Sequence, residues 1–150
     1  MFLGCFSWHG PGRLVAITGT MRSANCITTL ENNLLPQIEA WFASGSCIFQ
    51  QDNAPCHKPA MVRSFLNDQE ITTMEWPPYS PDMSPIENLW GIIKKKLHSV
   101  PVTSKPDLNN EVHKIWQNDE EILSNCKKLI ESMPRQIEEC LKAKAGYTRY

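Results

Sequence analysis

The segment Trp76–Pro85 constrains the fold of this chain more than any other feature, because it places four prolines within ten residues. Each proline fixes its own φ angle and restricts the residue before it, so the segment must be a stiff, extended loop. Strand-like and helical segments are mixed before this loop, and helical periodicities follow it. That order predicts an α/β or α+β domain in which helices flank a sheet.

Short β-branched or aromatic runs predict the strands, and apolar residues at helical spacing predict the helices. The first expected element is a hairpin over residues 1–7 and 13–18, with its turn at His9–Gly12. A helix should begin after Ser23. A strand at Ser46–Gln50, a helix over 57–66 and a strand at Ile71–Met74 follow in chain order. After the loop, Ser84-Pro85 predicts a helix that runs to about Leu97. Asp107 is expected to cap the next helix, and Pro134 to open the last one.

The bulk properties set limits on the class of protein. The chain has 150 residues, enough for one domain, and a net charge of −1, which predicts no partner by itself. No apolar run reaches the roughly 18 residues that a membrane span needs. The six cysteines form no C-x-x-C pair. Cys56 beside His57 comes nearest to a metal-ligand pair, but adjacent side chains at a helix start diverge.

Two carboxylates stand at positions where catalytic groups are found. Asp52 follows a predicted strand, where open α/β sheets place their chemistry, although a turn aspartate bonding its own backbone is the simpler interpretation. Glu87 fits a capping box with Ser84, which by itself predicts only a helix start. On the helical wheel Glu87 borders the apolar arc, with Gly91 and Lys94 beside it, so it could also face a cleft.

The two segments together resemble a known signature. Residues Phe49–His57 (FQQDNAPCH) and Trp76–Trp90 (WPPYSPDMSPIENLW) resemble the motifs of Tc/mariner-like DDE transposases, with 34 residues between Asp52 and Glu87 as in the Tc branch. The opening Gly4–Gly10 resembles the central hairpin of that family, and residues 142–150 resemble its C-terminus. The resemblance covers essentially the whole chain.

The resemblance implies an RNase H-like fold, a mixed sheet with flanking helices, and cut-and-paste DNA transposition. In the family, three carboxylates hold two Mg²⁺ ions, with Mn²⁺ as a possible substitute, for phosphoryl transfer. Asp52 matches the second carboxylate and Glu87 the third. The implied partner is double-stranded DNA, both transposon ends and target, and the full-length protein is expected to form a homodimer and to act in the nucleus.

The chain also departs from the family pattern. Residues 1–51 contain no aspartate, so the first metal ligand has no counterpart, and the N-terminal helix-turn-helix region is absent. Residues 1–150 are therefore predicted to be a partial, N-terminally truncated catalytic domain that is inactive alone. The alternative is a non-catalytic, transposon-derived remnant that binds DNA or a protein partner.

Three basic residues near the two carboxylates are candidate DNA contacts. Lys94 and Lys95 follow Glu87 on the same helix, although a lysine run is more often a solvated face. His57 either contacts DNA or starts its helix, and the structural interpretation is favoured. Asp82, which lies between prolines, is assigned to the loop.

Overall fold

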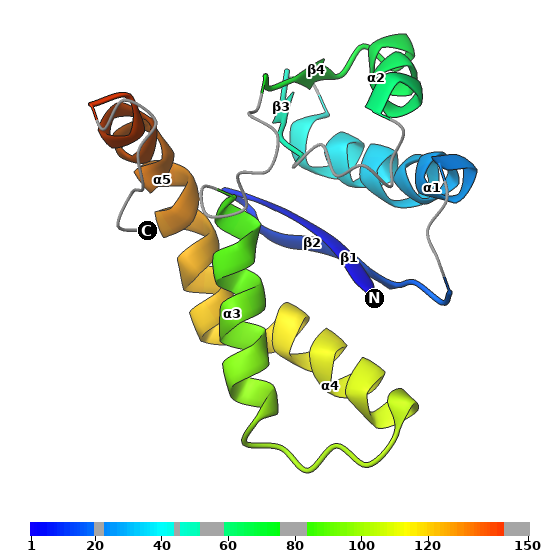
Figure 1. Cartoon of the computed structure of the whole chain (residues 1–150), viewed down its shortest axis with the longest axis vertical. Coiled ribbons are helices and arrows are strands. Elements are labelled where there is room, and N and C mark those ends of the chain that lie inside the picture. Colours follow the sequence, from blue (N-terminus) through cyan, green and yellow to red (C-terminus); the bar gives the residue numbers. More distant parts are fainter. Residues whose placement is uncertain (20–22, 44–45, 52–58, 76–83, 143–150) are drawn as a thin grey trace. The chain divides into compact units, whose positions relative to one another are not determined.

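The computed structural model describes residues 1–19, 23–43, 46–51, 59–75 and 84–142. In these ranges the elements are β1 (Phe2–Ser7), β2 (Gly10–Ala16), α1 (Ser23–Phe42), β3 (Ile48–Phe49), α2 (Pro59–Asp68), β4 (Thr72–Thr73), α3 (Pro85–Leu97), α4 (Lys105–Asn118) and α5 (Glu120–Lys142) (Figure 1). The chain divides into two compact units. The first comprises Met1–Leu3 and Val15–Pro81, and the second comprises Gly4–Leu14 and Asp82–Tyr150.

Strands β1 and β2 form the predicted hairpin. At its open end, the backbone N–H of Ile17 donates to the carbonyl of Met1 over 2.7 Å. The turn lies at Trp8–His9, two residues shorter than expected, and Gly10 already begins β2. Gly10 has a φ of 124°, which a residue with a Cβ rarely adopts, so this glycine allows the chain to reverse early.

In the first unit, β3 and β4 are parallel, with α2 as the connection between them. Ile48 pairs with Thr72 and Phe49 with Thr73. A parallel pair needs such a crossover, and α2 buries Val62 and Leu66 completely. α1 contacts α2 and buries a stripe of its own side chains, namely Cys26, Leu30 and Leu34. Both strands are shorter than the five and four residues that the sequence predicts.

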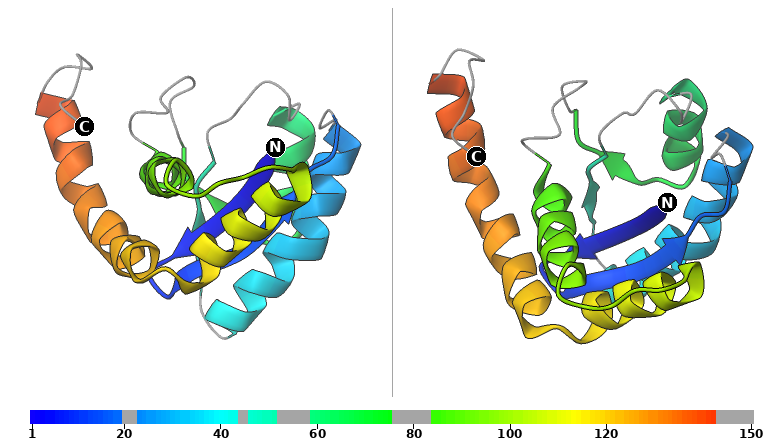
Figure 2. Two further views of the ribbon diagram at one scale, coloured as in Figure 1. Left: turned by 90° about the horizontal axis from the view of Figure 1, so that it is seen from below. Right: turned by 60° about the horizontal axis from the view of Figure 1, so that its bottom comes forward.

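The second unit is built around Trp116, whose side chain is fully buried. Helices α3, α4 and α5 all contact one another (Figure 2). Trp90 of α3 stacks on Trp116 of α4 with ring centroids 5.3 Å apart. The indole Nε1–H of Trp116 donates to the carbonyl of Gly12 over 2.8 Å, which ties β2 to α4. The other fully or nearly fully buried side chains of the three helices are Leu89, Ile93, Val112, Ile122 and Cys126.

Two expectations about helix ends are wrong. Ser104, not Asp107, is the N-cap of α4, and its hydroxyl accepts a hydrogen bond from the backbone N–H of Asp107 over 3.2 Å. Pro134 does not open a helix, because α5 continues through it from Glu120 to Lys142. A proline inside a helix removes one backbone hydrogen bond, yet the amphipathic helix α5 continues on both sides of Pro134.

Two further observations concern the whole described chain. None of the helices in the described ranges is both long enough and apolar enough to cross a membrane. Cys5, Cys26, Cys47 and Cys126 form no disulfide with one another in the described ranges. Burial raises the pKa of the Cys126 thiol to about 11, so this cysteine is a packing residue of the second unit.

Candidate active site

The parallel pair β3–β4 defines the edge at which the predicted site begins. Both strands run the same way, and the backbone N–H of Met74 donates to the carbonyl of Phe49 over 2.8 Å at their carboxyl ends. Past β3 the chain enters residues 52–58, and past β4 it enters the proline-rich residues 76–83. Both motif segments therefore leave the sheet from one edge, the edge where open α/β sheets place their ligands. Asp52, His57 and Asp82 themselves lie outside the described residues.

Glu87 lies in the first turn of α3 and is exposed. Its carboxylate makes no ion pair or hydrogen bond with the part of the chain that the structure describes. The capping box, which was the structural alternative for Glu87, is not formed. Ser84 is the N-cap, but its hydroxyl makes no cap hydrogen bond, and the N–H of Glu87 donates instead to the Ser84 backbone carbonyl over 3.1 Å. Glu87 is therefore available to bind a ligand.

The surface of α3 next to Glu87 is open. Gly91 lies one turn further along, and a Cβ built there would meet no heavy atom of the described residues within 4 Å. Lys94 lies two turns along and is also exposed. The opposite side of the helix carries buried Leu89 and Ile93. α3 thus carries Glu87 on the exposed side of a helix whose other side is packed.

The three lysines at the end of α3 have two different roles. Lys94 and Lys95 are exposed, whereas Lys96 forms ion pairs within the fold. Its Nζ lies 2.8 Å from Asp119 Oδ2 and 3.0 Å from Glu121 Oε2, at the junction of α4 and α5. The hydrogen bond from Lys96 holds the pKa of Asp119 below its usual range, and the same bond raises the pKa of Lys96. The sequence gives no signal for this pairing, because the partners are more than 20 residues apart.

The described residues include one of the two candidate metal ligands, Glu87. Among the described residues, no three His, Cys, Asp or Glu side chains lie close enough to hold a metal ion. Glu87 suits a hard divalent cation, since it offers carboxylate oxygens that are exposed and uncommitted. Residue 52, the other candidate ligand, lies in the segment that begins just past Gln51. The donor chemistry of the two candidates fits magnesium or manganese.

Comparison with known proteins identifies the family. Residues 1–109 match the family described as DDE superfamily endonuclease. The chain belongs to this family. The match spans β1 to the first turns of α4 and includes both Asp52 and Glu87.

Curated relatives place the chain in the Tc/mariner branch of the family. It is 32% identical over 150 residues to the transposable element Tcb1 transposase of Caenorhabditis briggsae and 30% identical to the transposable element Tc1 transposase of Caenorhabditis elegans. Each alignment covers 100% of this chain and 54% of the relative. The chain therefore spans about half the length of the relatives it matches.

Solved structures show the same fold. The catalytic domain of the Mos1 mariner transposase matches with a TM-score of 0.84 at 20% identity, covering 99% of this chain and 75% of that one. A Mos1 catalytic domain structure with raltegravir and Mg matches with a TM-score of 0.86 at 19% identity, covering 99% and 76%. A Mos1 paired end complex with Mn matches with a TM-score of 0.86 at 20% identity, covering 99% and 44%. The RNase H-like α/β fold predicted from the sequence is confirmed.

Proposed function

We propose that this chain is the catalytic part of a DNA transposase that cuts and rejoins DNA by two-metal phosphoryl transfer, with Asp52 and Glu87 as metal ligands. The observation that carries this proposal is the parallel β3–β4 pair. Because the two strands are parallel, the chain leaves both at the same sheet edge, toward Asp52 after β3 and toward Glu87 after β4. Glu87 is exposed in the first turn of α3, with no hydrogen bond or ion pair to the described residues. Family membership and the 34-residue spacing support the same assignment.

The chemistry follows from hard oxygen ligands. Bound Mg²⁺ or Mn²⁺ would supply Lewis acidity, which lowers the pKa of a water nucleophile and stabilises the leaving oxygen. The contribution of this chain is to position the ligands. The stack of Trp90 on Trp116 fixes α3 one turn beyond Glu87, and open space at Gly91 leaves room for a phosphate to approach. Such rigid support matters because catalysis by positioning tolerates little misplacement.

The proposed partners are double-stranded transposon ends and target DNA. Solved Mos1 structures include a paired-end complex with the left transposon end, which supports DNA as the partner of this fold. Lys94 and Lys95, exposed on the helix of Glu87, and His57 are proposed DNA contacts. A homodimer in the full-length protein and action in the nucleus belong to the same proposal. Because residues 1–51 contain no aspartate to act as the first ligand, we expect the chain alone to be inactive.

The test is Mn²⁺ binding, which can be measured without catalysis. Paramagnetic Mn²⁺ titrated into the ¹⁵N-labelled chain should broaden the amide signals of Gln51 and of the first turn of α3 before any others. Asp52→Asn and Glu87→Gln should each weaken this broadening. Glu120→Gln is the matched control, because Glu120 is also an exposed glutamate in a helix first turn, that of α5.

The outcomes separate clearly. Broadening that the Asp52 and Glu87 variants reduce and the Glu120 variant leaves unchanged would support the assigned ligands. Broadening that is equal in all three variants, or that centres on α5, would contradict the assignment. Nicking of DNA by the unmodified chain with Mg²⁺ would contradict the expectation that it is inactive alone.

A further inference from the structure

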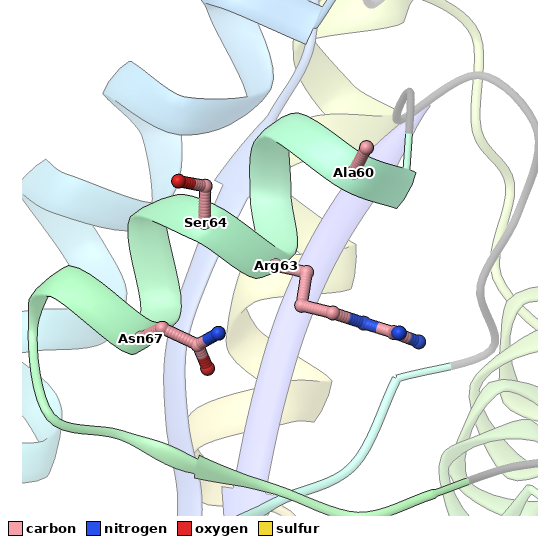
Figure 3. A pocket seen from close by; sticks show the side chains of 4 residues that line it. All are labelled: Ala60, Arg63, Ser64 and Asn67. Atoms are coloured by element: carbon pink, nitrogen blue, oxygen red, sulfur yellow. The ribbon is translucent and has the colours of Figure 1, made fainter.

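One polar face of α2 is not accounted for by the packing of the first unit. Val62 and Leu66 are buried completely on one side of the helix. The other side carries side chains at helical spacing that line an open hollow of about 430 Å³, namely Ala60, Arg63, Ser64 and Asn67. Arg63 and Asn67 project from the same side of the helix (Figure 3). We call these four residues the α2 face.

The chemistry of the α2 face suits an anion. Arg63 supplies a permanent positive charge with forked donors, and Ser64 and Asn67 supply neutral donors. No aromatic or large apolar side chain is among the described residues that line the hollow, as an enclosed small-molecule pocket would require. The carboxylate of α2, Asp68, lies at the end of the helix and is not part of the lining.

Arg63 is not used inside the fold. Its guanidinium makes no ion pair or hydrogen bond with any residue that the structure describes. Other basic side chains do have partners: Lys96 forms ion pairs with Asp119 and Glu121, and Lys127 makes a cation–π contact with the ring of Trp8, 4.5 Å from its centroid. An exposed arginine with two neutral donors on one helix face is the kind of group that contacts a phosphate backbone.

The position of the face indicates which anion. α2 is the crossover from β3 to β4, so it begins at the edge where both strands end, directly after residues 52–58. Arg63 lies about one turn into the helix. We propose that the α2 face contacts the phosphate backbone of the DNA that is bound at the Asp52 edge, with Arg63 as the charged contact. This inference rests on the proposed function and adds a second surface for the same partner.

The experiment measures duplex binding by fluorescence anisotropy over a range of salt concentrations. Each phosphate that a protein neutralises contributes about 0.9 to the slope of log K against log salt. Arg63→Ala should therefore reduce the slope by about 0.9 and weaken binding roughly eight-fold at 0.1 M salt. Asn67→Ala should weaken binding without changing the slope. The effects should not depend on the DNA sequence, because backbone contacts carry no sequence information.

The matched control is Arg135→Ala. Arg135 is also exposed on a helix, but three glutamates lie about one turn before or after it, namely Glu131, Glu138 and Glu139. An unchanged slope for Arg63→Ala, an equal loss in Arg135→Ala, or no measurable duplex binding by the wild type would overturn the proposal. The Mn²⁺ titration decides the metal ligands separately, so failure of the α2 face can be told apart from failure of the proposed function. Unchanged circular dichroism would show that Arg63→Ala still folds.

Discussion

Gly4 is a position where a single added methyl group should lower the stability of the second unit. A Cβ built on Gly4 would lie 3.1 Å from Leu14 Cδ1, 3.2 Å from Trp116 Cζ2 and 3.3 Å from Trp116 Cη2. These contacts are tighter than side chains normally tolerate, so a neighbour must move. Trp116 cannot readily do so, because it stacks on Trp90 and donates to the carbonyl of Gly12.

The magnitude follows from two opposing effects. Overpacking a well-packed core costs about 1–3 kcal/mol, and replacing a strand glycine by alanine returns about 0.5–1 kcal/mol through the unfolded chain. Taking the middle of each range, Gly4→Ala should therefore lower the free energy of unfolding by about 1 kcal/mol. Gly91→Ala is the control with the opposite sign. Gly91 is exposed on a helix, and a Cβ there would have no neighbour within 4 Å in the part of the chain that the structure describes, so the substitution should stabilise the protein by roughly 1 kcal/mol.

Urea unfolding followed by far-ultraviolet circular dichroism measures both variants. A lower midpoint for Gly4→Ala and a higher one for Gly91→Ala, with unchanged slopes, is the expected result. If Gly4→Ala were as stable as the wild type, Trp116 would have room to move. The claim that the β1–Trp116 contact requires a glycine would then be wrong. Comparing the double variant Gly4→Ala/Leu14→Ala with Leu14→Ala alone would show which neighbour resists. Most of the destabilisation by Gly4→Ala should persist in that background if Trp116 is the rigid neighbour.

Two further predictions concern helix ends. Ser104→Ala should lower the free energy of unfolding by about 1 kcal/mol, because it removes the hydroxyl that accepts a hydrogen bond from the Asp107 N–H. Ser84→Ala should lower it far less, since the Ser84 hydroxyl makes no cap hydrogen bond. Equal losses of stability in thermal melts of the two variants would contradict this contrast. Because Lys96 lowers the folded pKa of Asp119 below the ordinary 3.8, the stability lost in Lys96→Met should be fully visible above about pH 5 and should disappear as the pH falls through the folded pKa. If the difference in free energy of unfolding between the wild type and Lys96→Met stayed constant down to pH 2 in urea titrations, this prediction would be refuted.

Local chemistry in the sequence is sufficient for several parts of the fold. Pro85 at the first helical position and the apolar residues that follow predict both ends of α3 correctly, because those signals act within a few residues. The hairpin is predicted for the same reason, since its strands are adjacent in the chain. The two motifs and their spacing also identify the family and propose Asp52 and Glu87 as ligands. All of these inferences need only neighbouring residues or a resemblance.

Tertiary structure decides what depends on residues distant in the sequence. Lys96 resembles its neighbours Lys94 and Lys95 in sequence, yet only folding brings Asp119 and Glu121 to it. The need for glycine at position 4 arises from Trp116, more than 100 residues away. The physical reason is the same in each case: packing and charge pairing between distant segments exceed the small local preferences that a sequence pattern reveals.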